Sequence, residues 1–351
     1  MRVVVVLLAA TAVGTLVSAA SASPHDVNVS NVTLNVATYP LQGDDVLLKA
    51  AGLDKTPYKV KYQDLSSGGL QTQAVNSGVA DIGRGSGVAN ALVAAAGPIH
   101  FFSVATLKIS TYQQDTIVLK SSGITSVAQL KGQKVAYVPN TTPQYFLLKQ
   151  LQAAGLSWSD ITPVPLDTST GLAALLSGSV AAFATFGNVN TALTEGATVL
   201  ADGGPYLKGR LGALQGTYNA YAADLKNPGK EAAIADFIAR VNTAFAWTRS
   251  HATQWAAILA KNTSQPQATV LANFEGSEKA ANSWVGANTA EAISNEQDYG
   301  NAFLQTGVIT SPVDAASTFS NKLSGQIAAD EAAYQKKYPS YFAKPSWLTA
   351  T

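Results

Sequence analysis

The sequence contains no cysteine, only three histidines and few charged residues. Without cysteine the chain has no disulfide, no thiolate metal ligand, no cysteine nucleophile and no lipid-bearing cysteine to anchor an exported protein. His25, His100 and His251 are scattered, and their spacing is not that of a metal site or a catalytic triad. We therefore expect no cofactor, no metal site and no catalytic residue. Carboxylates distant in sequence can still meet in space, so acid/base chemistry stays open.

Charge is scarce and balanced. Charged residues make up 13% of the chain, and 23 Lys and Arg face 22 Asp and Glu for a net charge of +1. Such a chain has no field with which to hold nucleic acid or an anionic membrane. The 351 residues and 47% hydrophobic content instead indicate a globular protein with room for two domains of ordinary size.

The longest apolar run lies at the N-terminus. Arg2 is followed by apolar residues 3–17 and then by a stretch of Ser and Ala. This order is typical of a secretory signal, which we place at residues 1–22 with cleavage after Ala20 or Ala22. The run is too short to span a membrane comfortably. With no cysteine for a lipid anchor, a free periplasmic protein is expected.

Four Asn-x-Ser/Thr sequons leave open a different secretory setting. They would be glycosylation acceptors in a eukaryotic protein, although a chain rich in Asn and Thr also produces them by chance. The four begin at Asn28, Asn31, Asn140 and Asn262.

Two segments about a hundred residues apart share one pattern. Residues 69–83 and 171–183 each read as a Gly-led apolar helix, a Ser-Gly stop and a small-residue strand. Glycine just past a helix takes the left-handed conformation that ends it. The repetition predicts two similar α/β lobes with a ligand-binding cleft between them, although helix-Ser-Gly-strand also recurs by chance in α/β proteins.

The remaining pattern extends this division. Strands and helices alternate through both runs, the chain crosses back near Thr217, and a long helix starts at Asn227-Pro228. We predict an α/β fold in which each lobe is a central sheet flanked by helices, with a helical C-terminal extension. Lobe 1 is placed at 32–112 and 219–351, lobe 2 at 113–218, and the hinge at 110–116 and 216–221.

From about Leu34 to about Pro312 the chain resembles the aliphatic sulfonate, taurine and nitrate type of ABC-transporter substrate-binding proteins. The segments that carry the resemblance are 74–83, 124–136, 151–156, 160–161 and 199–203. The resemblance implies a two-lobed periplasmic-binding-protein fold of type II, with lobes that close on a small organic anion. It also implies a monomer that delivers the anion to an ABC permease and its ATPase.

In that family the ligand contacts loops at helix starts. The corresponding loops here are 39–43, 66–69, 85–87, 140–143 and 185–188. Free N–H groups at a helix start attract an oxyanion, and hydroxyls donate further hydrogen bonds, although simple helix capping explains any one hydroxyl as well. The candidate ligand-binding residues are Pro40, Gln42, Ser67, Gly68, Arg84, Ser86, Gly87, Lys108, Asn140, Thr141, Thr142, Thr185, Phe186, Asn188 and Tyr218.

Arg84 is the main candidate for charge pairing with the anion. Its guanidinium suits a sulfonate, nitrate or carboxylate, and the alternative is a surface arginine. Lys108 is a weaker candidate of the same kind, with solvation as its alternative. Family members often carry an aspartate in the second Ser-Gly strand, and residues 180–186 have none. Taurine is therefore less expected than a sulfonate with an uncharged tail, against which Phe186 could pack, whereas Phe183 suits the core.

Two other classes remain possible for this fold. A desulfinase-type hydrolase of similar outline uses a cysteine nucleophile, which this chain lacks, so we expect a binding protein and not an enzyme. A sensor domain that binds the same solute has the same sequence features. Neighbouring genes for an ATPase and a permease would distinguish transport from sensing.

Overall fold

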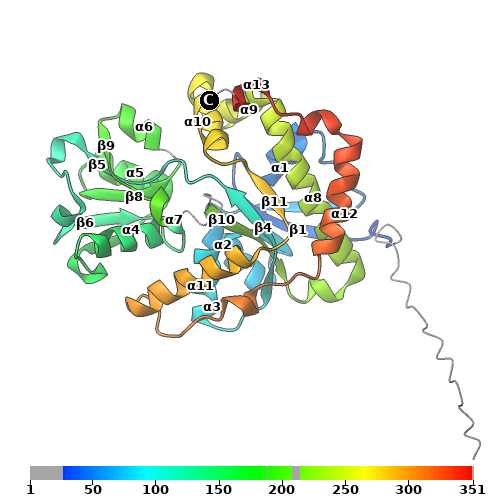
Figure 1. Ribbon diagram of the computed structural model, residues 1–351, viewed down its shortest axis with the longest axis horizontal. Helices are drawn as coiled ribbons and strands as arrows, with labels where there is room; N and C mark the ends of the chain where they lie inside the picture. The colour runs from blue at the N-terminus through cyan, green and yellow to red at the C-terminus, as the bar shows by residue number, and fades with distance from the viewer. Residues whose placement is uncertain (1–26, 188, 208–213, 350–351) are drawn as a thin grey trace, which may run out of the picture.

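The computed structural model describes residues 27–187, 189–207 and 214–349, so the expected signal peptide at 1–22 lies outside the described residues. Its strands form two sheets that lie side by side, with most of the C-terminal helices gathered around the first (Figure 1). The six-stranded sheet has the order β11-β4-β10-β3-β1-β2, and the five-stranded sheet has the order β7-β6-β8-β5-β9. The predicted two-lobed α/β architecture is confirmed.

The first sheet is mixed. β1 pairs in parallel with β2 and β3, whereas β10 is antiparallel to both β3 and β4. Its elements, in chain order, are β1 (Thr33–Thr38), α1 (Asp44–Ala50), β2 (Lys59–Asp64), α2 (Gly68–Asn76), β3 (Ile82–Ser86), α3 (Gly87–Ala96), β4 (Phe101–Ile109), β10 (Leu214–Tyr221) and β11 (Trp284–Gly286).

The second sheet is buried on both faces. Successive residues of a strand point to opposite sides, so Val135 joins one core and Ala136 the other, as do Ala182 and Phe183. Its elements are β5 (Gln114–Leu119), β6 (Lys134–Tyr137), α4 (Thr142–Ala153), β7 (Thr162–Pro165), α5 (Thr168–Leu176), β8 (Ala182–Phe186), α6 (Val189–Thr194), β9 (Ala197–Asp202) and α7 (Gly204–Leu207), with single 3-10 turns at Lys120–Ser122, Val127–Leu130 and Trp158–Asp160.

The repeated Ser-Gly pattern forms the same turn in both lobes. Gly78 follows α2 with φ +74° and Gly178 follows α5 with φ +73°. Their N–H groups donate to the carbonyls of Val75 (3.0 Å) and Leu175 (2.9 Å), and the chain then enters β3 or β8. β3 and β8 are both internal strands of their sheets, so the pattern identifies a central strand in each lobe.

The C-terminal extension is helical except for β11. Asn227 caps the first helix by accepting hydrogen bonds from the N–H groups of Gly229 and Lys230, and Pro228 occupies the first turn. The extension consists of α8 (Pro228–Ser250), α9 (Ala252–Thr263), α10 (Gln267–Ala280), β11, α11 (Ala290–Gln305), α12 (Ser324–Lys337) and α13 (Ser346–Thr349), with 3-10 turns at Asp224–Lys226, Ala315–Thr318 and Pro339–Phe342.

The crossings between lobes differ in part from the predicted hinge. The first crossing, 110–113, joins β4 to β5 within the predicted segment 110–116, whose last three residues belong to β5. The predicted second hinge segment, 216–221, instead lies within β10, which is paired with β3 and β4 on its two sides. Residues 214–218, which we assigned to lobe 2, therefore belong to the first sheet. The error arose because residues 214–221 form one β-rich run whose sheet membership no local pattern reveals.

Candidate functional site

Three helices begin at one place between the two sheets. α2 and α3 come from lobe 1 and α4 from lobe 2, and their N-terminal residues border a cavity of ≈ 110 Å³. We call this the helix-start cavity. Its lining residues are Tyr39, Gly68, Arg84, Gly85, Ser86, Leu107, Ile109, Gln114, Thr141, Thr142, Phe186 and Gly216. Since both lobes contribute, a bound molecule would hold them together.

The helix starts present donors to this cavity. Ser67 and Ser86 act as N-caps, because their hydroxyls accept hydrogen bonds from the N–H groups of Leu70 and Ala89, each at 3.2 Å. One cap satisfies only one of the four N–H groups that have no partner within a helix start. The remaining N–H groups and the partial positive charge of three helix ends create an environment suited to an oxyanion.

The hydroxyls of α4 do not act as the sequence suggested. Thr141 Oγ1 donates to the carbonyl of Val138 (2.6 Å), and Thr142 Oγ1 donates to Oε1 of Gln114 (2.9 Å). No hydrogen bond between described residues uses the Gln114 Nε2 group. The side-chain amide of Gln114, at the start of β5, is therefore a further buried donor beside the start of α4, and it belongs to a residue that we did not predict.

Arg84 lines the cavity but its charge is already paired. Its Nη2 donates to the carboxylate of Asp44, and its Nε donates to the hydroxyl of Tyr218 (2.8 Å). The Tyr218 hydroxyl in turn donates to Asp44 (3.0 Å). Burial opposes the charged form, but the Asp44 carboxylate outweighs it and raises the pKa of Arg84. The Phe245 ring also lies 5.4 Å from the guanidinium carbon. Arg84 therefore places a cation at the cavity, and the Asp44 carboxylate neutralises its charge.

Lys108 does not contribute to the cavity. Its neighbours Leu107 and Ile109 both line the cavity from β4. Because side chains alternate along a strand, Lys108 lies on the opposite face. Lys108 is therefore not among the described lining residues of either space.

The other predicted residues divide into three groups. Gly68, Arg84, Ser86, Thr141, Thr142 and Phe186 line the helix-start cavity. Pro40 and Gln42 line the adjoining chamber. Five predicted residues line neither space. Ser67 caps α2, Gly87 packs against Tyr299, and Asn140 borders a separate surface depression. Thr185 is buried in β8, and Tyr218 lies behind Arg84. Asn188 lies outside the described residues.

A second, larger space adjoins the first. It has a volume of ≈ 490 Å³ and shares Tyr39, Arg84, Ile109 and Phe186 with the helix-start cavity. Most of its remaining wall comes from the C-terminal extension: Phe245 and Thr248 of α8, Trp255 and Leu259 of α9, and Phe274, Ser277 and Glu278 of α10. We call it the aromatic chamber. The chamber was not predicted, because apolar residues at helical spacing are typical of a core.

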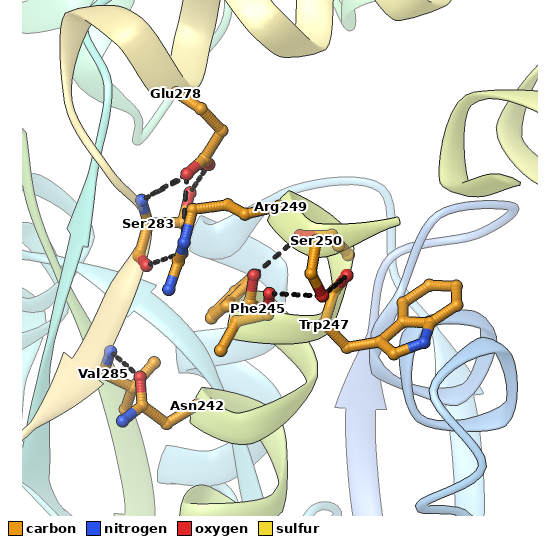
Figure 2. A network of polar contacts seen from close by, with 10 residues as sticks. Asn242, Phe245, Trp247, Arg249, Ser250, Glu278, Ser283 and Val285 are labelled. Atoms are coloured by element: carbon orange, nitrogen blue, oxygen red, sulfur yellow. Dashed lines mark hydrogen bonds and ion pairs between the residues drawn. The ribbon is translucent and has the colours of Figure 1, made fainter. Parts of the chain in front are cut away.

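A polar network that includes the lining residues Glu278 and Ser283 borders the chamber, and Figure 2 shows its hydrogen bonds from close by. Glu278 accepts hydrogen bonds from the N–H (3.1 Å) and hydroxyl (2.6 Å) of Ser283, and its carboxylate lies 3.5 Å from Nη1 of Arg249. Arg249 also donates to the carbonyl of Ser283 (2.7 Å). Burial raises the pKa of Glu278 despite these partners. The charged groups of Glu278 and Arg249 therefore both have partners within the protein.

Within 27–187, 189–207 and 214–349 no set of three or more histidine or acidic side chains is grouped in a way that could hold a metal ion. Over the same residues, no helix has the length and apolar character needed to cross a membrane.

Comparison with known proteins agrees with the resemblance found in the sequence. A family model described as "NMT1/THI5 like" matches residues 48–203. An aliphatic sulfonates-binding protein from Escherichia coli (strain K12) is 31% identical over 220 residues, which are 62% of this chain and 66% of that relative, just under two thirds of its length. Both matches are similar in kind to the resemblance that the sequence segments indicated.

Solved structures agree with the fold. The periplasmic aliphatic sulphonate binding protein SsuA from Escherichia coli superposes with a TM-score of 0.69 at 26% identity, covering 82% of this chain and 92% of that one. The desulfurization enzyme DSZB shares the fold alone, with a TM-score of 0.58 at 15% identity over 85% of this chain and 99% of that one. The predicted periplasmic-binding-protein fold is confirmed.

Proposed function

We propose that this chain, whose residues 48–203 carry the NMT1/THI5-like family match, is an exported solute-binding protein for a small organic anion, with an aliphatic sulfonate as the first candidate. The observation that carries the proposal is the convergence of the starts of α2, α3 and α4 on one interlobe cavity. The relationship to aliphatic sulfonate-binding proteins supports the same ligand class.

The cavity recognises the anion by dipoles and hydrogen bonds. Helix starts and the Gln114 amide supply donors among buried residues, where hydrogen bonds are stronger than in bulk water. The Arg84–Asp44 pair adds no net charge. Hydrogen bonds between described residues use Nε and Nη2 of Arg84 but not Nη1, which leaves further donors on a group that lines the cavity.

Binding is coupled to closure of the lobes. Lobe 1 contributes Gly68 and Ser86 and lobe 2 contributes Gln114 and Thr142 to the same cavity, so the complete set of contacts exists only when the lobes are together. A ligand with more contacts in the closed form shifts the population toward it, and no covalent step is needed. The hinge is assigned to 110–113, the described crossing between β4 and β5.

The cellular setting follows from the same assignment. The signal segment at 1–22 directs export to the periplasm, where the unanchored protein acts as a monomer. It hands its ligand to the permease and ATPase of an ABC importer. Export predicts a mature N-terminus after Ala20 or Ala22, which the mass of the secreted protein measures.

An enzyme of this fold acting on an organosulfur acid is the alternative, and the fold shared with DSZB is the observation that favours it. The described lining of the helix-start cavity includes no histidine or carboxylate to act as a base. A binding protein returns its ligand unchanged, whereas an enzyme releases a product that mass spectrometry detects. A sensor would bind the same ligand but would leave uptake intact when deleted.

A thermal-shift screen tests the proposal. Methanesulfonate, longer alkanesulfonates, taurine, nitrate, sulfate esters and aromatic acids are each added to the purified mature protein. A ligand at a hundredfold its dissociation constant adds about 2.7 kcal/mol to the free energy of unfolding, which is easily measured. We expect stabilisation by sulfonates. Absence of a shift with every anion would overturn the proposal.

A further inference from the structure

We infer that the aromatic chamber is a tail subsite, and that the ligand is an organic anion whose tail is uncharged, bulky and built around a ring. This inference rests on the proposed function, since the anionic group must first be held in the helix-start cavity. It narrows the ligand from a small organic anion to one whose tail fills a space of ≈ 490 Å³.

The two spaces form one continuous site. Tyr39, Arg84, Ile109 and Phe186 border both of them, so a molecule held at the helix starts has its tail directed past these side chains. The helix-start cavity, at ≈ 110 Å³, has room for the anionic group and little else. Any tail longer than a methyl group must therefore enter the chamber.

The chamber wall is suited to a ring. Phe245, Trp255 and Phe274 come from three successive helices of lobe 1, and Phe186 reaches the chamber from the end of β8 in lobe 2. Aromatic walls bind aromatic groups in offset or edge-to-face geometry beyond the gain from apolar burial. A methyl or ethyl tail would leave most of the chamber to water, whereas a ring system would displace that water and touch both lobes.

The charges at the wall exclude an ionic tail. Arg84 and Glu278 are the charged residues among those that line the chamber. Arg84 is paired with Asp44, and Glu278 accepts from Ser283 and faces Arg249. An ammonium group in the chamber would be desolvated without a free carboxylate to receive it. A neutral tail meets no such cost.

This assignment places tail recognition in the helical extension of lobe 1. The sequence suggested the apolar strand of the second Ser-Gly pattern for this role. Phe183 of that strand is 1% exposed and packs within the core of lobe 2. Phe186, three residues later, is the part of that strand that reaches the chamber.

The test compares dissociation constants measured by calorimetry for methanesulfonate, benzenesulfonate and 2-naphthalenesulfonate with the mature protein. Because each added apolar group that fits a pocket improves binding by about tenfold or more, we expect 2-naphthalenesulfonate to bind at least a hundredfold more tightly than methanesulfonate. Phe274→Ala should reduce this ratio at least tenfold. Ser277→Phe, which fills the chamber from the same helix, should reduce it as well.

A matched control separates tail recognition from general damage. Phe102→Ala removes a partly buried phenylalanine of β4 that lines neither space, and should leave the ratio unchanged. Equal binding of the three sulfonates would overturn the tail subsite while the proposed function stands. Failure of all three to bind would overturn the tail subsite as a sulfonate site, and the thermal-shift screen of the other anions would then decide the proposed function. An unchanged ratio in the folded Phe274→Ala and Ser277→Phe proteins would also refute the subsite.

Discussion

Asp44, at the first turn of α1, holds the guanidinium of Arg84, at the centre of β3, from a position with no exposed side-chain surface. The hydroxyl of Tyr218 bonds to both residues and completes a buried triangle beneath the helix-start cavity. The residue that the sequence marked as an anion receptor is thus first a structural partner. Its substitution affects folding and binding together.

The buried triangle predicts a large loss of stability for Arg84→Ala. The variant leaves the Asp44 carboxylate buried without its cation, and breaking such a pair from one side costs about 3–5 kcal/mol in free energy of unfolding. Urea denaturation measures the loss. The double variant Asp44→Asn with Arg84→Gln removes both charges and should recover most of it. A loss as large in the double variant would mean that packing, and not the unpaired charge, explains the effect.

An exposed pair supplies the control for that experiment. Lys131 lies 3.5 Å from Asp160 with 70% of its side chain exposed. Solvent screens such a pair, so Lys131→Ala should leave the denaturation midpoint unchanged within error.

Glu296 predicts a pH dependence of stability. This carboxyl is 0% exposed, and burial raises its pKa from 4.5 to about 8, although Thr318 and Asn90 donate hydrogen bonds to it. Between these pH values the unfolded chain releases the proton and the folded chain keeps it. Stability is therefore fully present below pH 4.5 and is lost as the pH rises toward 8.

The variant Glu296→Gln isolates this contribution. It stays neutral in both states, so its stability should exceed that of the parent by an amount that grows between pH 5 and pH 8, on the order of 2–4 kcal/mol at the upper end. Urea denaturation at each pH gives the difference. Burial also raises the pKa of Asp115 and Asp224 to about 6. Both groups are present in the parent and in the variant, so their contributions cancel in the difference in stability. A difference that does not change with pH would contradict the assignment.

The position of Lys108 predicts that its substitution does not change anion affinity. Since Leu107 and Ile109 line the cavity and Lys108 faces away, Lys108→Ala should change the dissociation constant of a sulfonate less than twofold. Calorimetry measures it, with Gln114→Ala as the positive comparison because its amide borders the cavity. A tenfold loss for Lys108→Ala would mean that the side chain reaches the ligand in solution.

The positions of helix ends and helix starts were predicted well, because neighbouring residues determine them. The Ser77-Gly78 and Ser177-Gly178 pairs need left-handed glycine wherever they occur, and Asn227-Pro228 starts a helix in any context. β11 escaped notice because three residues carry little pattern. The second crossing was misplaced because the pairing of β10 depends on strands more than a hundred residues away.

The predicted residues that line the cavity lie mostly where a local pattern marks a helix start. Ser86 and Thr141 were found because they precede helices, which is a matter of neighbouring residues. The pairing of Asp44 with Arg84 was missed because an acid in the first turn of α1 already has a local explanation in the helix dipole. Phe245, Trp255 and Phe274 read as core, and only the packing of three helices against lobe 2 makes them a chamber wall.

Gly69 gives a direct test of lobe closure. It is the second residue of α2, and a Cβ placed there would lie 2.9 Å from Cβ and 3.1 Å from the carbonyl oxygen of Asn140, across the interlobe boundary. Gly69→Ala should therefore hold the lobes apart without harming lobe 1, because Ala favours a helix more than Gly does. Overpacking of this kind costs about 1 kcal/mol or more, so we expect at least a fivefold loss of sulfonate affinity.

Gly325→Ala is the matched control for Gly69→Ala. Gly325 is likewise the second residue of a helix, α12, and a Cβ there meets nothing within 4 Å. Both variants should keep or raise the melting temperature of the free protein, and only Gly69→Ala should weaken binding. Small-angle scattering of the sulfonate complex should also give a larger radius of gyration for Gly69→Ala than for Gly325→Ala. Equal affinity and equal radii in the two variants would show that closure at the Gly69–Asn140 contact is not required for binding.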